Sequence, residues 1–274
     1  MAANGKIFAE LAKILLLELQ SIDPSFIQNE DSSDHDLIVT YFNFFWRHIP
    51  ACIRKIEKAK GFLCPENLSS DLQQLEEKIS LGSDLTPYMS RDLTKKINIE
   101  KHDPLLNDWG IDHLHFTPQG GKEIMFVKVT ADTIYEIGIY DHNSWTDIDV
   151  LNIVVDNWPN LIKHYKVVGD VKPAFVSDGD AIKNFRKIGV NCPVLLKDGN
   201  NYFPPGVGVM ADRSSMAAHI CAMEYINDSL SRLAEKVVHI TKNGKFLLIH
   251  SNHKCIARIP HPKYFIEIAR NNFF

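Results

Sequence analysis

The stretch that decides the fold is IMFVKVTADTIYEIGIY, residues 124–140. It holds two apolar runs, 124–129 and 134–140, joined by a short polar turn. Runs rich in β-branched and aromatic residues on either side of such a turn are typical of a β-hairpin. A strand-like segment at 111–116 comes just before it, so we expect a small sheet in this half of the chain.

The segments before this sheet predict helices. Apolar side chains recur at helical spacing in 6–20, 36–60 and 68–80. After residue 103, strands alternate with shorter helices. Further strands are expected at 174–177, at 193–197 and in a second hairpin at 237–249 with an Asn-Gly turn, and a long helix at 214–235.

The order of these elements indicates an α+β protein. A helical region at 1–100 precedes a mixed sheet-containing body with β-hairpins at 101–274, whose C-terminal segment is basic. This order is compatible with two regions or with one continuous domain.

The composition is that of an ordinary globular protein. Of 274 residues, 45% are hydrophobic and 23% charged, which excludes disordered and fibrous classes. The N-terminal apolar run is interrupted by Glu10, Lys13 and Glu18, so it predicts an amphipathic helix and not a signal peptide, and no run is long enough to cross a bilayer. Five scattered cysteines without a CxxC pair favour reduced thiols. We therefore expect a cytoplasmic protein with no membrane partner.

The formal charge of −4 is unevenly distributed. Residues 232–274 hold eight Lys or Arg against two Asp or Glu, a net +6, which leaves −10 on the rest. Basic side chains among aromatic ones are typical of surfaces that bind phosphates and stack bases. The alternative is a docked subdomain whose charge offsets an acidic body. The candidate nucleic-acid-binding residues are Lys242, Lys245, Lys254 and Arg258.

The block DWGIDHLHF, residues 108–116, places two imidazoles two positions apart. Alternate side chains of a strand share a face, so His113 and His115 point together while Leu114 points to the core. If this strand pairs with the hairpin, one polar face is expected, with Gly138 as an open floor. Its candidate catalytic residues are His113, His115, Lys128, Glu136, Tyr140 and His142.

Two chemistries use such a set. The first is metal-independent cleavage of RNA, in which His113 or His115 is the general acid, Glu136 or the other imidazole is the base, and Lys128 with Tyr140 binds phosphate. It requires no cofactor. The second is a hydrolase or oxygenase site for a transition metal ion. Its ligands would be His113, His115 and His142 with Glu136 or Asp141.

A third interpretation gives the histidines a structural role only. Clustered imidazoles on a sheet face can simply hydrogen-bond to their neighbours. The chain is then a non-enzymatic module that binds nucleic acid or protein, through the basic segment or through the aromatic helix around Phe44, Phe45 and Trp46.

The loop at 204–215 precedes the predicted helix at 214–235. Helix N-termini bind anions through their free N–H groups and the helix dipole. The candidate anion-binding residues are Gly206, Gly208, Arg213 and Ser214. The alternative is a loop in which Asp212 or Ser214 only caps the helix.

The block DPLLNDWGIDHLH, residues 103–115, resembles a motif of uncharacterised bacterial proteins, and the loop at 204–215 fits the same pattern. That motif carries His where Asp112 stands here, which argues against a catalytic role for Asp112. The order of helices before a small sheet is also similar to RelE-like ribonuclease toxins, a likeness of architecture without a shared motif. The histidine-rich face and the basic, aromatic C-terminal segment lead us to expect a bacterial ribonuclease of toxin or phage-defence type, with RNA as substrate and an antitoxin as a possible protein partner, and the RelE-like architecture agrees with this hypothesis.

Overall fold

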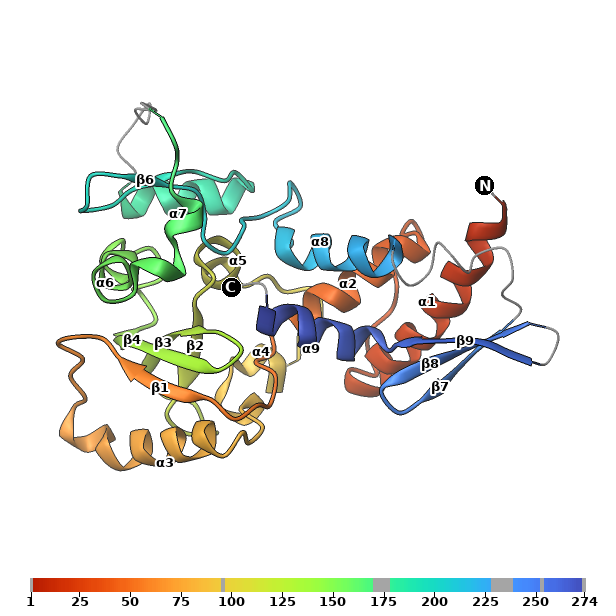
Figure 1. The fold of residues 1–274 in the computed structure, drawn as a ribbon, viewed down its shortest axis with the longest axis horizontal. Coiled ribbons are helices and arrows are strands. Elements are labelled where there is room, and N and C mark those ends of the chain that lie inside the picture. Colours follow the sequence, from red (N-terminus) through yellow and green to blue (C-terminus); the bar gives the residue numbers. More distant parts are fainter. Residues whose placement is uncertain (1, 95–96, 170–177, 228–238, 252–253, 273–274) are drawn as a thin grey trace.

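The computed structural model describes residues 2–94, 97–169, 178–227, 239–251 and 254–272. Figure 1 shows two parts side by side, one around a four-stranded sheet and the other around helices and a three-stranded sheet. The α+β expectation is confirmed, because a helical N-terminus precedes a body with antiparallel hairpins.

The four-stranded sheet has the order β1-β4-β3-β2. β3 and β4 form the predicted hairpin, and β2, which carries the two histidines, pairs antiparallel with β3 as expected. Its strands are β1 (Lys55–Lys58), β2 (Asp112–His115), β3 (Glu123–Val129) and β4 (Thr133–Asp141).

The helix predicted at 36–60 is wrong in its second half. Helix α2 (Asp34–Trp46) begins with a capping box between Ser33 and Asp36 and ends before Pro50. A proline restricts the residue before it and lacks the N–H that a helix requires. Lys55–Lys58 instead forms β1, which runs parallel to β4. The other two predicted helices are present as α1 (Ala2–Ile22) and α3 (Ser69–Ser80).

Helix α2 is almost completely buried in the second part of the molecule. Figure 1 shows it beside α1, α8 and α9, with the three-stranded sheet next to α1. The second predicted hairpin is present here as β7 and β8. The elements are α8 (Met216–Tyr225), β7 (His239–Asn243), β8 (Phe246–Ser251), β9 (Lys254–Pro260) and α9 (Pro262–Asn272). Residues 228–235 of the predicted helix lie outside the described residues, as do the first two residues of the predicted hairpin and the strand predicted at 174–177.

One hydrophobic core joins these helices to the sheet. It contains Leu114, Met125 and Val127 from one face of the sheet together with residues of α1, α2, α8 and α9. The packing therefore crosses the boundary expected at residue 100, and β1 lies in the sheet although it precedes that boundary.

The opposite face of the sheet has its own core. Ile111, Ile124 and Phe126 pack there against Trp109 and α6. The elements around it are α5 (Pro104–Trp109), α6 (Asp149–Asn157), α7 (Gly179–Ile188), β5 (Val194–Leu195) and β6 (Asn201–Tyr202). Short connecting helices are η1 (Glu66–Leu68), η2 (Thr86–Tyr88), α4 (Arg91–Thr94), η3 (Pro159–Leu161) and η4 (Lys163–Tyr165).

A β-bulge in β4 changes which side chains share a face. Phe126 pairs with Gly138, but the next residue, Val127, pairs with Glu136, so Ile137 is an extra residue. Side chains before the bulge therefore alternate in the opposite sense to those after it. Glu136 lies on the same face of the sheet as Val127. Beyond the bulge, the even-numbered side chains of β4 lie on the opposite face.

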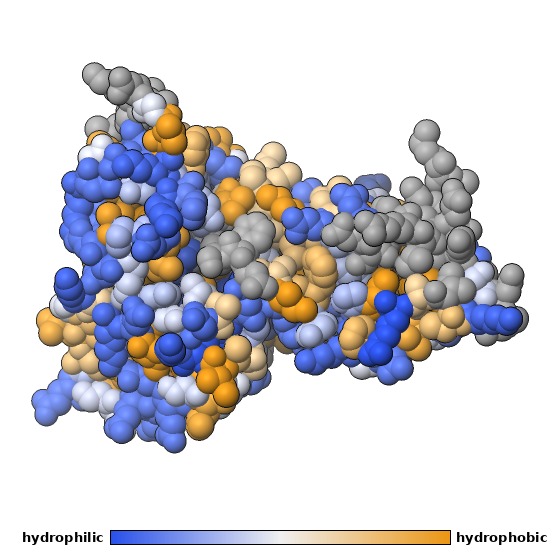
Figure 2. Space-filling view, in the orientation of Figure 1, coloured by the Kyte–Doolittle hydropathy of each residue, from blue (hydrophilic) through white to orange (hydrophobic). Residues whose placement is uncertain are grey.

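The surface of the molecule is mixed in character. On the face shown in Figure 2, hydrophilic residues cover most of the part that holds the four-stranded sheet, and apolar residues gather near the junction of the two parts. Among the described helices, none combines the length and the apolar character needed to cross a membrane.

Candidate functional site

Three imidazoles, the histidine cluster, gather on one face of the sheet: His113, His115 and His142. The ring centroids of His113 and His115 are 6.0 Å apart, and His142, just after β4, is 5.6 Å from His115. Trp145 lies against the cluster, with its ring 4.9 Å from that of His113. His115 is buried and His142 is exposed. The structure thus brings the three predicted histidines together.

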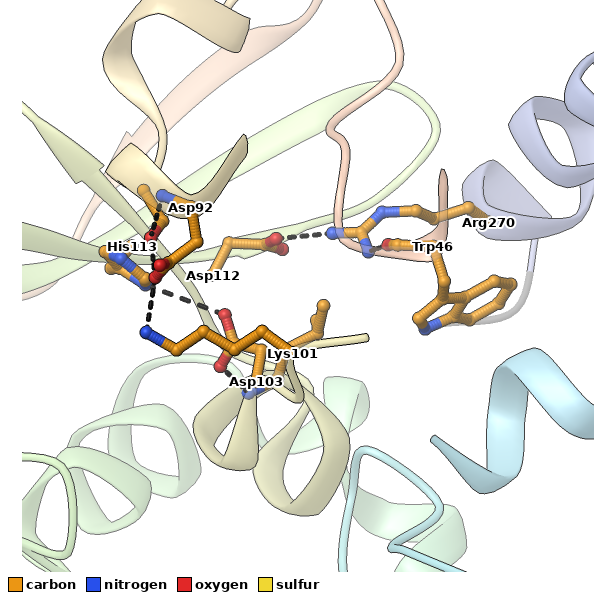
Figure 3. A network of polar contacts seen from close by, with 9 residues as sticks. Trp46, Asp92, Lys101, Asp103, Asp112, His113 and Arg270 are labelled. Carbon is orange, nitrogen blue, oxygen red and sulfur yellow. Dashed lines mark hydrogen bonds and ion pairs between the residues drawn. The ribbon is translucent and has the colours of Figure 1, made fainter. Parts of the chain in front are cut away.

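A helix–turn–strand unit positions the first two histidines. Asp103 caps α5 by accepting a hydrogen bond from the Leu106 N–H at 3.0 Å. Gly110 ends α5 in the left-handed region at φ 63°, where glycine has no steric cost, and the chain then enters β2. This path leaves Asp103 Oδ2 3.8 Å from His113 Nδ1, as Figure 3 shows.

Two other carboxylates of the same block have structural partners. Asp108 accepts a hydrogen bond from Arg186 Nε at 2.9 Å. Asp112 forms a buried ion pair with Arg270, which also donates to the Trp46 carbonyl (Figure 3). Asp112 therefore links the sheet to α9 and does not belong to the histidine cluster.

Burial and nearby cations keep the imidazoles of β2 neutral. Burial lowers the pKa of His115 to about 4, helped by the neighbouring histidines and by Arg91. Burial also lowers the pKa of His113, and Asp103 opposes that shift. Lys101, which pairs with Asp92 beside His113 in Figure 3, contributes further positive charge. Near neutral pH, both imidazoles can accept a proton.

The loop between β2 and β3 holds the exposed side of the site. His142 Nε2 lies 3.2 Å from the Gly121 carbonyl, and the Arg91 guanidinium donates to the Gln119 carbonyl at 3.4 Å. Gly120 has φ 82° and lies against Arg91, where a Cβ atom would be 3.2 Å from Nη2. One loop therefore places an exposed imidazole and an exposed guanidinium at the same edge.

Glu136 is absent from this face, contrary to prediction. The bulge at Ile137 turns its side chain to the opposite face, where it is completely buried. Lys58 Nζ lies 4.0 Å away, and neither carboxylate oxygen has a hydrogen bond to any of the residues that the structure describes. Burial, and secondly the charge of Glu76, raises the pKa of Glu136 to about 8. The group is thus protonated at neutral pH and cannot serve the histidines as a base.

The prediction that Lys128 binds phosphate is also wrong. Its side chain is fully buried, 1% exposed, so it cannot bind a phosphate from solvent. Burial lowers its pKa to about 7, and the charges that act on it are those of Asp112 and Arg270.

Tyr140 lies on β4, separated from the two histidines of β2 by β3, and Gly138 is not an open floor. The Tyr140 ring stacks on Phe126 with centroids 4.6 Å apart. A Cβ atom on Gly138 would be 2.9 Å from the Tyr140 ring. The glycine therefore makes room for the tyrosine and not for a ligand. Burial raises the pKa of Tyr140 to about 12, so its hydroxyl remains a proton donor.

The loop at 204–215 uses its glycines for packing. The Gly206 N–H donates to the Asp108 carbonyl at 2.9 Å, and the Gly208 N–H donates to the Asn107 carbonyl at 2.8 Å. A Cβ on Gly206 would be 2.3 Å from the Leu106 carbonyl oxygen. These N–H groups hold the loop on α5 and are not available to an anion.

The end of this loop caps α8. Ser214 donates through its N–H and its hydroxyl to Asp212. The capping residue is Ser215, whose hydroxyl accepts from the Ala218 N–H. Arg213 is exposed at φ 71°. The geometry supports the capping alternative, with Ser215 in place of Asp212 or Ser214, and not the anion site.

Most of the candidate nucleic-acid-binding cations contact other residues of the same chain. All four candidate cations are exposed, and three of them also have intramolecular partners. The pairs are Lys242 with Glu18 of α1, Lys245 over the Tyr264 ring at 4.6 Å, and Arg258 over the Phe246 ring at 3.5 Å. Of these contacts, only that of Lys242 with Glu18 offsets acidic charge, as the interpretation of a docked subdomain expects.

The arrangement is better suited to proton transfer than to metal binding. Within the described ranges, no three His, Cys, Asp or Glu side chains are grouped so that they could hold a metal ion. Sequence reasoning missed Arg91, Asp103 and Trp145. Asp103 carried a helix-capping signal, but only the folded loop brings Arg91 to the cluster.

Comparison of the chain with protein-family models, curated proteins and solved structures gives no match. The function must therefore be inferred from the geometry of the site.

Proposed function

We propose that the protein is a metal-independent ribonuclease of toxin or phage-defence type in the bacterial cytoplasm, and that the histidine cluster is its active site. The observation that carries this proposal is the approach of three imidazoles, with centroid distances of 5.6 and 6.0 Å along the cluster, next to the carboxylate of Asp103 and the guanidinium of Arg91. RNA is the proposed substrate.

The reaction needs one proton acceptor and one proton donor. A neutral imidazole takes the proton of the 2′-hydroxyl while the 2′-oxygen attacks phosphorus, and a protonated imidazole gives its proton to the departing 5′-oxygen. The products are a 2′,3′-cyclic phosphate and a 5′-hydroxyl. We assign the acceptor role to His115, which is neutral near pH 7 because burial lowers its pKa to about 4.

The donor and the charge-stabilising group lie at the exposed edge. His142 is exposed and so accessible to a substrate, and Arg91 can offset the charge that develops on the phosphate. The Asp103 carboxylate, 3.8 Å from His113 Nδ1, acts on the His113 ring through its charge. In this scheme Arg91 replaces Lys128, and the imidazoles replace Glu136. A ribonuclease of toxin type also implies an inhibitory protein partner.

The test is cleavage of a single-stranded RNA with a fluorophore and a quencher at its ends, in the presence of EDTA. We expect cleavage to products with a 2′,3′-cyclic phosphate, and a rate about 10² to 10⁴ times lower for His142→Ala or His115→Asn. His164→Gln, at an exposed position in η4, is the matched control and should retain the wild-type rate.

Three results would overturn the proposal. They are intact RNA after incubation with the wild-type protein, a His113→Ala, His115→Ala double variant as active as wild type, and cleavage abolished by EDTA. The last result would favour the transition-metal alternative.

A further inference from the structure

A second group of side chains with metal-binding chemistry lies between α2 and α8: His35, His219 and Met223. We name it the His-Met group. His35 Nε2 is 3.3 Å from Met223 Sδ, and the ring centroids of His35 and His219 are 6.0 Å apart. All three side chains are partly exposed. The group comes from different elements than the histidine cluster and is independent of the proposed ribonuclease activity.

The fold holds these three side chains in place. His219 and Met223 are four residues apart on α8 and so project from the same helix face. His35 lies in the first turn of α2, which the capping box between Ser33 and Asp36 fixes. α2 and α8 pack closely, with the Phe42 and Tyr225 rings 5.6 Å apart. The group is therefore preorganised by core packing.

The donor atoms select a particular class of metal ion. Imidazole nitrogen and thioether sulfur are softer ligands than carboxylate oxygen, and thioether sulfur favours Cu(I) over Mg²⁺ or Ca²⁺. Bonds of about 2.0 Å to nitrogen and about 2.3 Å to sulfur bring the two donor atoms to roughly 3.3–3.8 Å from each other at ordinary angles. The observed 3.3 Å lies at the lower end of that range.

Local charge is compatible with a bound cation. The first turn of α2 carries Asp34 and Asp36, which offset the positive end of the helix dipole. Within the described ranges, no three His, Cys, Asp or Glu side chains are grouped so that they could hold a metal ion. That finding does not exclude the His-Met group, because one of its ligands is a thioether.

We propose that the His-Met group binds one Cu(I) ion, with His35 Nε2, Met223 Sδ and the His219 imidazole as ligands. Without copper, the same contact is an N–H···S hydrogen bond between His35 and Met223.

The test is anaerobic titration of the full-length protein with Cu(I) in competition with a chromophoric chelator. We expect one tightly held Cu(I) per chain, and a loss of affinity of at least about tenfold for Met223→Leu or His219→Gln. Leucine has nearly the volume of methionine, so Met223→Leu should fold normally. Met210→Leu and His164→Gln remove the same donor types elsewhere and should leave the affinity unchanged.

X-ray absorption of the copper-loaded protein gives a second readout. The proposal requires a sulfur shell near about 2.3 Å that disappears in Met223→Leu. It would be overturned if the protein lost all Cu(I) to the competitor, or if Met223→Leu bound Cu(I) with wild-type affinity and an unchanged spectrum.

Discussion

Replacing Glu136 by glutamine should stabilise the protein increasingly as the pH rises. The carboxyl group is completely buried between the sheet and α3, without a hydrogen bond to any described residue, and Lys58 Nζ is 4.0 Å away. Its pKa is raised from the ordinary value of 4.5 to about 8. The unfolded chain releases this proton above pH 4.5, whereas the folded chain retains it until about pH 8. The wild-type protein therefore loses stability between these two values.

The size of the effect follows from the two pKa values. One pKa unit corresponds to about 1.4 kcal/mol, so wild type loses about 5 kcal/mol in total by pH 8 and about 3 kcal/mol by pH 7. Glutamine at position 136 cannot ionise and escapes this loss. Any cost of burying its amide is independent of pH, so the pH dependence identifies the cause.

The assay is urea unfolding of wild type and Glu136→Gln from pH 5 to pH 9. The free energy of unfolding of the variant minus that of wild type should rise by about 1.4 kcal/mol per pH unit up to pH 8 and then level off. Glu77→Gln, at an exposed position of α3, is the matched control for the loss of one carboxylate. A difference that stays constant from pH 5 to pH 8 would refute the reasoning.

Two further substitutions test the packing around the site. Arg270→Ala leaves Asp112 buried without its cation and should lower the free energy of unfolding by about 3–5 kcal/mol in urea titrations; a loss below about 1 kcal/mol would contradict the assigned ion pair. Gly206→Ala places a Cβ atom 2.3 Å from the Leu106 carbonyl oxygen, so we expect a loss of about 3 kcal/mol or more and a lower melting temperature. Gly121→Ala, whose Cβ would have only a contact at 3.7 Å, is the control, and equal melting temperatures of the two variants would count against the close packing of the loop on α5.

The two faces of the four-stranded sheet differ in their ionisable groups. One face carries the exposed imidazole of His142, and the other buries the carboxyl group of Glu136. Activity assays on the first face and stability measurements on the second are therefore expected to respond to different substitutions.

The sequence by itself determined the elements that depend on neighbours along the chain. The alternation in 124–140, the turn residues and the Asn-Gly signal predicted both hairpins, and the 3.6-residue period predicted α1 and α3. Strand parity placed His113 and His115 on one face, because alternation within a short regular strand requires no distant contact.

Only the tertiary structure shows which residues belong to the candidate site. The bulge at Ile137 is defined by the pairing of β3 with β4, and it reversed the parity that had placed Glu136 beside the histidines. β1 forms because its backbone pairs with β4, although its sequence lies within a pattern that favours a helix. Arg91 is held near the cluster by its hydrogen bond to the Gln119 carbonyl, where its charge acts on His115, and Lys128 is buried beside charges of α9 and β2. Register, loop closure and burial depend on residues far apart in the chain, so local periodicity carries no information about them.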